Sequence, residues 1–248
     1  MERPAVAKSN LREAEVSDRW LNAIMFPIIQ SQVSFESGGK DICLDCFLPT
    51  ANGQRFPAVI GLHGSAGGHA SMADPASLLA EQGFAVYVLH YFDRTGTTEI
   101  DGLQTIFRHF PFWMKTLWDA VSFVARQPQV DPERIGLLGF SLGAYLALSA
   151  SAIDSRIQAV VDFFGGMPKE MKFFTRRLCP VLILHGDQDK TVPVEEAYHL
   201  QKILEKKQIA YEIQIYPGAG HGFTGEVWRD AGLRTLAFLN KHLADGKI

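Results

Sequence analysis

The pentapeptide Gly139-Phe140-Ser141-Leu142-Gly143 has the residue types and the spacing of a serine nucleophile. It matches the pattern G-x-S-x-G, follows an apolar run that predicts a strand, and opens an Ala- and Leu-rich run that predicts a helix. Such a turn is so tight that side chains two residues before and after the serine would collide with neighbouring backbone, which accounts for Gly139 and Gly143. The motif presents the Ser141 hydroxyl beside the positive end of a helix dipole and predicts nucleophilic attack.

A serine hydroxyl needs a general base, and three of the eight histidines follow Ser141 and precede the last predicted helix. His199 falls within a predicted helix. His185 ends a predicted strand but precedes the candidate acids, which is the wrong order for this motif. His221 follows the last predicted strand and has a glycine on each side, so its loop can bring the imidazole across the sheet edge. His221 is therefore the predicted base.

The acid that orients this base has two candidates. Asp187 and Asp189 both follow an apolar run that predicts a buried strand, and both precede His221. Either carboxylate could accept a hydrogen bond from the imidazole, and the spacing does not separate them.

Two backbone amides are expected to bind the oxyanion. One is the amide of Leu142, the residue after the nucleophile. The other is expected from the glycine-rich stretch 63–68, where Ser65 is the first choice and Ala66 the second. This stretch does not fit a phosphate-binding loop, because no Gly-Lys-Ser/Thr follows it.

The elements around these residues alternate between short apolar runs and longer stretches of helical period. Runs that are apolar on both faces are typical of a parallel sheet covered by helices. The predicted strands of this kind are residues 57–63, 84–89, 135–140, 158–164, 181–185 and 211–216, the last an edge strand. The predicted helices are residues 72–82, 111–127, 142–152, 194–207 and 226–243. Residues 28–35 and 41–47 predict an antiparallel hairpin before them. The fold class is α/β, with a mostly parallel, doubly wound sheet and helices on both faces.

Substrate contacts are expected from residues close to these turns. The segments 91–113 and 165–177 are rich in aromatic and Met residues and predict cap-like loops over an apolar acyl or aryl group. The candidate substrate-binding residues close to these turns are His63, Phe92 and Phe140.

Composition narrows the class of protein. The chain has 248 residues and a formal net charge of −3, so it has no general attraction for nucleic acid or an anionic membrane. Residues 1–27 lack the basic start and the uninterrupted apolar core of a signal peptide and predict a leader segment before a single domain, 28–248. Three cysteines favour a reduced, cytoplasmic protein. A small-molecule substrate is expected, and the oligomeric state stays open.

Cys43 and Cys46 form a C-x-x-C pair within a predicted strand. Positions three apart on a strand point to opposite faces, so these thiols are not expected to chelate one ion. No metal and no organic cofactor is predicted.

Taken together, these motifs resemble the dienelactone hydrolase family of α/β-hydrolases over roughly residues 28–245. The resemblance is carried by the 63–68 loop, the Ser141 elbow, the stretch Gly186-x-x-Asp189-x-x-Val192-Pro193, and the glycine-flanked His221 followed by Phe223. It implies an α/β-hydrolase fold, and it favours Asp189 as the acid because that family places the acid three residues before the Val-Pro pair.

The chain also departs from the family pattern. Founding members have a cysteine where Ser141 stands, a glutamate where this chain has Gly64-Ser65, and two arginines that hold a substrate carboxylate. Arg94 is the candidate for one arginine, and Gly225 occupies the place of the other. The expected activity is therefore serine-dependent cleavage of a carboxylic ester or thioester. The alternatives are dienelactone-like lactone hydrolysis, peptidase or acyltransferase activity, and a catalytically silent binding protein on the same fold.

Overall fold

The protein folds around one twisted sheet. The structure is a computed structural model that describes residues 25–51, 53–98, 100, 102–168, 171 and 178–244. Among these residues the sheet has eight strands in the order β1-β2-β4-β3-β5-β6-β7-β8, and of its strand pairs only β1–β2 and β2–β4 are antiparallel. The strands are β1 (Ile28–Ser37), β2 (Lys40–Pro49), β3 (Phe56–Leu62), β4 (Ala85–Leu89), β5 (Val130–Phe140), β6 (Ile157–Phe163), β7 (Val181–Gly186) and β8 (Tyr211–Tyr216).

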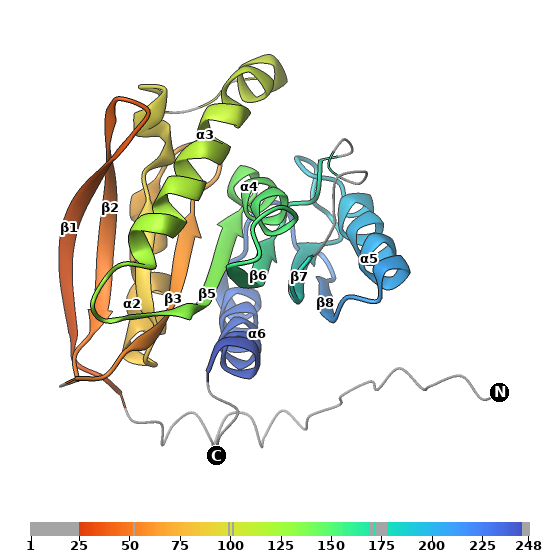
Figure 1. Cartoon of the computed structure of the whole chain (residues 1–248). Coiled ribbons are helices and arrows are strands. Elements are labelled where there is room, and N and C mark those ends of the chain that lie inside the picture. Colours follow the sequence, from red (N-terminus) through yellow and green to blue (C-terminus); the bar gives the residue numbers. More distant parts are fainter. Residues whose placement is uncertain are drawn as a thin grey trace.

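Helices cover both faces of this sheet. In Figure 1, α3, α4 and α5 lie in front of the strands, and α2 and α6 lie behind them. The helices are η1 (His69–Met72), α2 (Ala73–Glu81), η2 (Tyr91–Arg94), α3 (Leu103–Val124), α4 (Leu142–Ser151), α5 (Glu195–Lys207) and α6 (Gly225–Leu243), where η marks a 3₁₀ helix. The predicted α/β class and the two-sided helical cover are confirmed.

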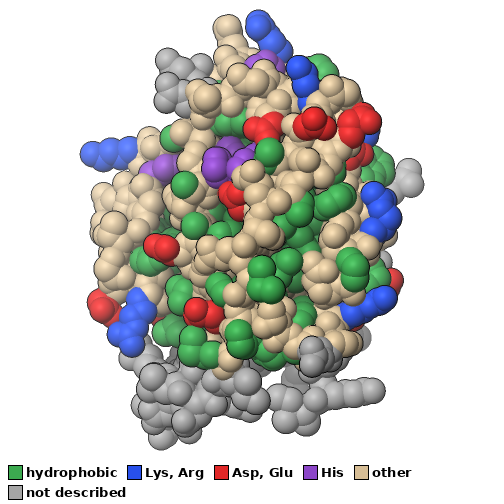
Figure 2. All heavy atoms as spheres, turned by 90° about the vertical axis from the view of Figure 1, so that its left-hand side faces the viewer, with side chains coloured by type: hydrophobic (Ala, Val, Ile, Leu, Met, Phe, Trp, Pro, Cys, Tyr) green, Lys and Arg blue, Asp and Glu red, His purple; other side chains and the backbone are tan. Residues whose placement is uncertain are grey.

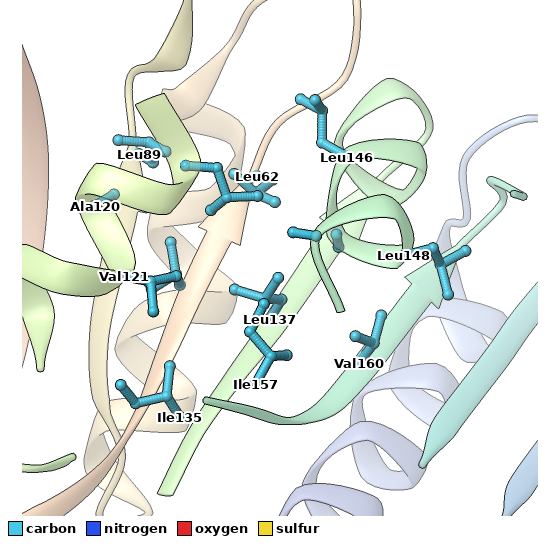
Figure 3. Packing of buried hydrophobic residues seen from close by; sticks show 14 of the residues in the cluster. Leu62, Leu89, Ala120, Val121, Ile135, Leu137, Leu146, Leu148, Ile157 and Val160 are labelled. Atoms are coloured by element: carbon cyan, nitrogen blue, oxygen red, sulfur yellow. The ribbon is translucent and has the colours of Figure 1, made fainter. Parts of the chain in front are cut away.

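The core lies in two layers, one on each face of the sheet. Every residue of β3 and of β7 is buried, as their unbroken apolar runs require. Figure 3 shows the layer beneath α3 and α4, where Leu137 and Val160 from the strands pack among Val121 and Leu146 from the helices. Burial of each such side chain contributes about 1.5–3 kcal/mol, so this layer holds the strands in register.

The start of α3 differs from the sequence prediction. The helix begins at Leu103, not at Pro111, and the proline lies inside it. Proline removes one backbone hydrogen bond and usually stops a helix. Here Pro111 has no amide hydrogen to donate to the carbonyl of Phe107, four residues earlier. Both residues are exposed, so water can donate to that carbonyl instead. Within the segment 91–113, residues 91–94 form η2 and residues 103–113 belong to α3, so these two parts are helical and not loops.

The other predicted boundaries agree with the structure within three residues, except that β5 begins at Val130 and not at residue 135. The hairpin is β1 with β2, and β8 is the edge strand. Of the second cap-like segment, residues 165–168 and 171 are described. The predicted leader falls outside the described residues except for its last three. Among the residues described, none of the helices combines the length and the apolar character that crossing a membrane needs.

Candidate active site

Three polar side chains from three loops meet at the carboxyl edge of the parallel strands. Ser141 follows β5, Asp189 follows β7, and His221 follows β8. The Oγ of Ser141 lies 3.0 Å from Nε2 of His221, and Nδ1 of His221 lies 2.7 Å from Oδ2 of Asp189. These are hydrogen-bonding distances, and they order the groups as hydroxyl, imidazole and carboxylate.

The backbone of Ser141 is held in an unusual conformation. Its φ of 53° and ψ of −116° place a non-glycine residue at positive φ, directly before α4. Such strain persists only where the surroundings fix it. The amide of Ser141 donates to the carbonyl of Phe163 at 2.9 Å, and the carbonyl of Ser141 accepts the amide of Ala144 at 2.9 Å. The turn is thus held by the adjacent strand β6 and by the first turn of α4.

Close backbone approaches explain the two glycines of the elbow. A β-carbon on Gly139 would collide with the backbone of Gly143 and Ala144, and one on Gly143 would collide with the carbonyl oxygen of Leu62. The absence of side chains at these positions lets β5 turn into α4 directly against β3.

Gly143→Ala is expected to lower the free energy of unfolding by about 1–3 kcal/mol, the usual cost of forcing extra atoms into a packed site. The matched control is Gly232→Ala within α6, where an added β-carbon meets no atom within 4 Å. That change is expected to raise stability by up to about 1 kcal/mol, because alanine favours the helix. Urea unfolding followed by circular dichroism measures both. A Gly143→Ala protein as stable as wild type would contradict the steric account.

The two candidate acids differ in what they contact. Oδ2 of Asp189 faces His221, and its Oδ1 accepts the amides of Thr191 and Val192, both at 2.8 Å. The Asp189 side chain is fully buried, and three donors fix its orientation. Asp187 instead accepts the amide of Gly218 at 2.7 Å through Oδ1. Asp187 therefore holds the loop that carries the histidine, and Asp189 contacts the imidazole itself.

His185 lies close to this pair without taking its place. Its Nε2 donates to the carbonyl of Val192 at 2.9 Å, and burial lowers the pKa of the imidazole. The ring therefore stays neutral near Asp189, and its donor is used on the backbone of the same loop. His199 lies within α5, as the sequence predicts.

A phenylalanine that the sequence reasoning missed supports His221. The ring of Phe164 lies 5.0 Å from the imidazole in an edge-on arrangement, and Phe164 has a φ of 41°. Its amide donates to the carbonyl of Leu184 at 2.8 Å, which fixes this turn after β6. The signal available in the sequence was its position, because residues that follow a buried parallel strand lie at the ligand-binding edge.

The glycine-rich loop after β3 lies beside the serine. A β-carbon on Gly64 would lie 3.5 Å from that of Ser141. The loop closes through the amide of Gly67, which donates to the carbonyl of Gly64 at 3.2 Å, and Ile100 donates its amide to the carbonyl of Ser65 at 2.7 Å. Leu142 is the first residue of α4, where backbone amides have no partner within the helix. The expected oxyanion donors, the amides of Ser65 and Leu142, thus belong to two turns that border Ser141.

Two of the four predicted substrate-binding residues form part of the support for that loop. His63 is buried, and its ring is stacked on Tyr91 at 4.2 Å and meets Phe92 edge-on at 4.7 Å. Burial lowers the pKa of His63 to about 4, and its Nδ1–H donates to the carbonyl of Gly64 at 2.9 Å. Tyr91, which the sequence reasoning did not single out, donates its hydroxyl to the carbonyl of His63 at 2.8 Å. His63 and Phe92 therefore hold the loop in place from within the core.

The other two predicted residues, Arg94 and Phe140, contact other parts of the protein. A guanidinium nitrogen of Arg94 donates to the carbonyl of Gly38 in the β1–β2 turn. Phe140 is 9% exposed and packs edge-on against Phe163 and Trp228. Nothing in these contacts supports a substrate-binding role for either residue. The sequence position of Arg94 gives no sign of this contact, because the β1–β2 turn is distant from it in the chain.

A buried carboxyl group lies behind the elbow. Asp162 on β6 is fully buried, and its Oδ1 accepts the amide of Gly165 at 2.9 Å. Burial raises the pKa of Asp162 to about 7. A β-carbon on Gly165 would approach this carboxyl group and the carbonyl oxygen of Ser141. Asp162 thus fixes the turn after β6 against the elbow. The sequence reasoning took it for an ordinary strand residue.

Comparison with known proteins shows the family to which this chain belongs. Residues 44–232, which include all three polar residues of the site, match the model of the dienelactone hydrolase family. The chain belongs to the dienelactone hydrolase family. The resemblance that the sequence motifs indicated is therefore confirmed for the family and for its α/β-hydrolase fold.

Individual relatives match different shares of this chain. A Bradyrhizobium protein named "Probable 2-oxo-3-(5-oxofuran-2-ylidene)propanoate lactonase" is 27% identical over 196 residues, 71% of this chain and 77% of the relative. Acyl-coenzyme A thioesterase 6 of Mus musculus is 41% identical over 116 residues, 46% of this chain but 25% of the relative. The hyperthermophilic esterase of Pyrobaculum calidifontis shares the fold with a TM-score of 0.70 at 19% identity, over 87% of each chain.

Proposed function

We propose that this chain is a serine hydrolase that cleaves a carboxylic ester, or a thioester, of a small to medium substrate through an acyl-enzyme. The observation that carries the proposal is the pair of contacts at 3.0 and 2.7 Å that link Ser141 to His221 and His221 to Asp189. Membership of a hydrolase family supports the reaction class.

In the proposed mechanism, the Oγ of Ser141 attacks the substrate carbonyl carbon while Nε2 of His221 accepts its proton. The amides of Leu142 and Ser65 donate to the oxyanion that develops. Asp189 holds the Nδ1–H tautomer of His221 and stabilises the imidazolium cation. Nε2–H then protonates the leaving alkoxide or thiolate, and the acyl group stays on Ser141. Water, deprotonated by His221, attacks the acyl-enzyme. The bond to Oγ of Ser141 then breaks, Nε2–H of His221 returns the proton to that oxygen, and the acid is released.

The chain's own residues favour a simple ester over a dienelactone carrying a carboxylate. A clamp of two arginines would require Arg94 and a second arginine where Gly225 stands, and Arg94 is engaged with Gly38. The thioester alternative is supported by the partial match to acyl-coenzyme A thioesterases, whose length this chain spans by about a quarter to a third.

Purified protein is expected to hydrolyse p-nitrophenyl esters of short to medium chain length with saturation kinetics, and the screen should include acyl-coenzyme A thioesters. The Ser141→Ala protein supplies the background. Hydrolysis of esters supports the proposal, and a larger kcat/KM for thioesters would assign the thioesterase branch. If the wild-type protein releases neither p-nitrophenol nor coenzyme A above the Ser141→Ala background, the proposal is contradicted and a catalytically silent binding protein is favoured.

The two aspartates supply a matched pair of variants. Asp189→Asn is expected to lower kcat by roughly 10²–10⁴-fold, because the amide can hold the wrong imidazole tautomer and cannot stabilise the cation. Asp187→Asn should cost less than about tenfold, because the amide keeps an oxygen that can accept the Gly218 amide, and one such hydrogen bond has a net value of about 1 kcal/mol. Kinetics of both variants on one ester decide the assignment. A severe loss in Asp187→Asn beside a mild one in Asp189→Asn would overturn it.

A further inference from the structure

A cluster of side chains that commonly ligate metals lies outside the Ser141 site. Asp45 is on β2, and His90 directly follows the neighbouring strand β4. His69 is the first residue of η1, which follows the 63–68 loop. The β2–β4 register pairs Leu44 with Leu89, and the amide of His90 donates to the carbonyl of Cys43 at 3.0 Å. Segments distant in the sequence are thereby brought to one point.

The nitrogen atoms of both imidazoles point at a single carboxylate oxygen. Oδ2 of Asp45 lies 2.7 Å from Nε2 of His90 and 3.1 Å from Nδ1 of His69. The two rings are stacked with centroids 3.6 Å apart. The three ligand atoms all lie within 4.8 Å of one another. Two ligand atoms of a tetrahedral zinc ion lie about 3.3 Å apart, since each is about 2.0–2.1 Å from the metal, so small outward shifts would make room for an ion.

The surroundings fit a metal site in two further respects. Gln32 donates Nε2–H to Oδ1 of Asp45 at 2.8 Å, which orients the carboxylate and leaves Oδ2 for the ion. The His69 side chain is 44% exposed and that of His90 is 10% exposed, so an ion can arrive from solvent on the His69 side. Figure 2 shows histidine side chains gathered beside an acidic side chain on this face of the molecule.

We propose that Asp45, His69 and His90 bind one divalent transition-metal ion of the zinc class, with water at the fourth position. Two imidazoles and one carboxylate suit such an ion, whereas Mg²⁺ and Ca²⁺ take oxygen ligands. Binding would join β2, the end of β4 and η1, which follows the 63–68 loop. The proposal does not depend on the hydrolase activity, because its test measures metal binding.

A second grouping, Cys43, His90 and Asp93, shares His90 with the first. In it the backbone amide of Cys43 donates to Oδ2 of Asp93 at 3.0 Å. We assign the ion to the first grouping because two of its ligand atoms, the imidazole nitrogens, already lie 2.7 and 3.1 Å from the third, Oδ2 of Asp45. Cys46 belongs to neither grouping. Its side chain is buried in the core layer on the other face of β2 from Cys43, as expected for two strand residues three positions apart.

The test is a calorimetric titration of the EDTA-treated, dialysed full chain with zinc chloride, repeated with Co²⁺, whose visible absorption reports its coordination. One ion per chain is expected. His69→Ala and Asp45→Asn should each weaken binding by about 100-fold or more, and Gln32→Ala by about 10-fold, the usual cost of removing a group that orients a ligand. His242→Ala on α6 is the control and should bind as wild type does.

Each outcome bears on the assignment. His69 is on the surface, so His69→Ala should keep the wild-type circular dichroism spectrum and the wild-type unfolding midpoint in EDTA, which separates lost binding from lost folding. Cys43→Ser should bind zinc as wild type does. The proposal is overturned if wild type takes up no stoichiometric ion, or if His69→Ala and Asp45→Asn bind as wild type does. Binding lost in Cys43→Ser but kept in His69→Ala would overturn it in favour of the second grouping.

Discussion

Ser141→Ala is expected to lower kcat for ester hydrolysis by roughly 10⁴–10⁶-fold, the range found when the serine of such a triad is removed. The hydroxyl is the atom that would form the acyl-enzyme, and it lies 3.0 Å from Nε2 of His221. Without this hydroxyl, water would have to attack the substrate carbonyl directly, and no acyl-enzyme would form. Steady-state rates on the best p-nitrophenyl ester measure the loss.

A stability measurement and a second serine variant are the controls for Ser141→Ala. The strain at Ser141 is held by backbone hydrogen bonds to Phe163 and Ala144, which an alanine retains, so the unfolding free energy should stay close to that of wild type. Ser151→Ala removes a serine hydroxyl from the far end of α4, the helix that follows Ser141, and should keep wild-type turnover. A Ser141→Ala protein that keeps more than a few per cent of wild-type kcat would show that Ser141 is not the nucleophile.

His221→Ala is expected to be nearly as harmful, again roughly 10⁴–10⁶-fold in kcat, because the hydroxyl and the imidazole act as a unit. Without the imidazole, no group accepts the Ser141 proton or protonates the leaving group. The double variant Ser141→Ala with His221→Ala should therefore lose little more than either single variant. The measurement is a double-mutant cycle on one ester, with His199→Ala as the histidine control.

Additivity in that cycle is the informative alternative. If the two losses multiply fully, each residue contributes to the rate independently, and a shared mechanism is contradicted. The unfolding free energy of His221→Ala should change little, because the loop stays linked to β7 through the Asp187–Gly218 and Gln188–Ala219 hydrogen bonds.

The sequence could predict those elements of the fold that local residue patterns determine. Buried parallel strands are continuous apolar runs, so β3 and β7 were placed within a residue or so. The elbow could be located because its glycines answer a local steric demand that the structure shows directly. His221 stood out because strand order brings the end of β8 to the same sheet edge as the end of β5.

What the sequence could not predict depends on contacts between distant segments. The spacing leaves Asp187 and Asp189 equivalent, and the structure separates them because Asp189 contacts the imidazole of His221 whereas Asp187 accepts the amide of Gly218. The contact between Arg94 and Gly38 of the β1–β2 turn likewise joins segments that are far apart in the chain. The grouping of Asp45 with His69 and His90 depends on the β2–β4 register, which no local pattern reveals.

Mapping a covalent adduct tests the central claim most directly. Wild-type protein treated with a fluorophosphonate, digested and examined by mass spectrometry, is predicted to carry one phosphonyl group, on the peptide that contains Ser141. The Ser141→Ala protein should carry none, and His221→Ala should label far more slowly, because the base that activates the hydroxyl is missing. Failure of the wild type to label, or an adduct on another residue that persists in Ser141→Ala, would contradict the assignment of Ser141 as an activated nucleophile.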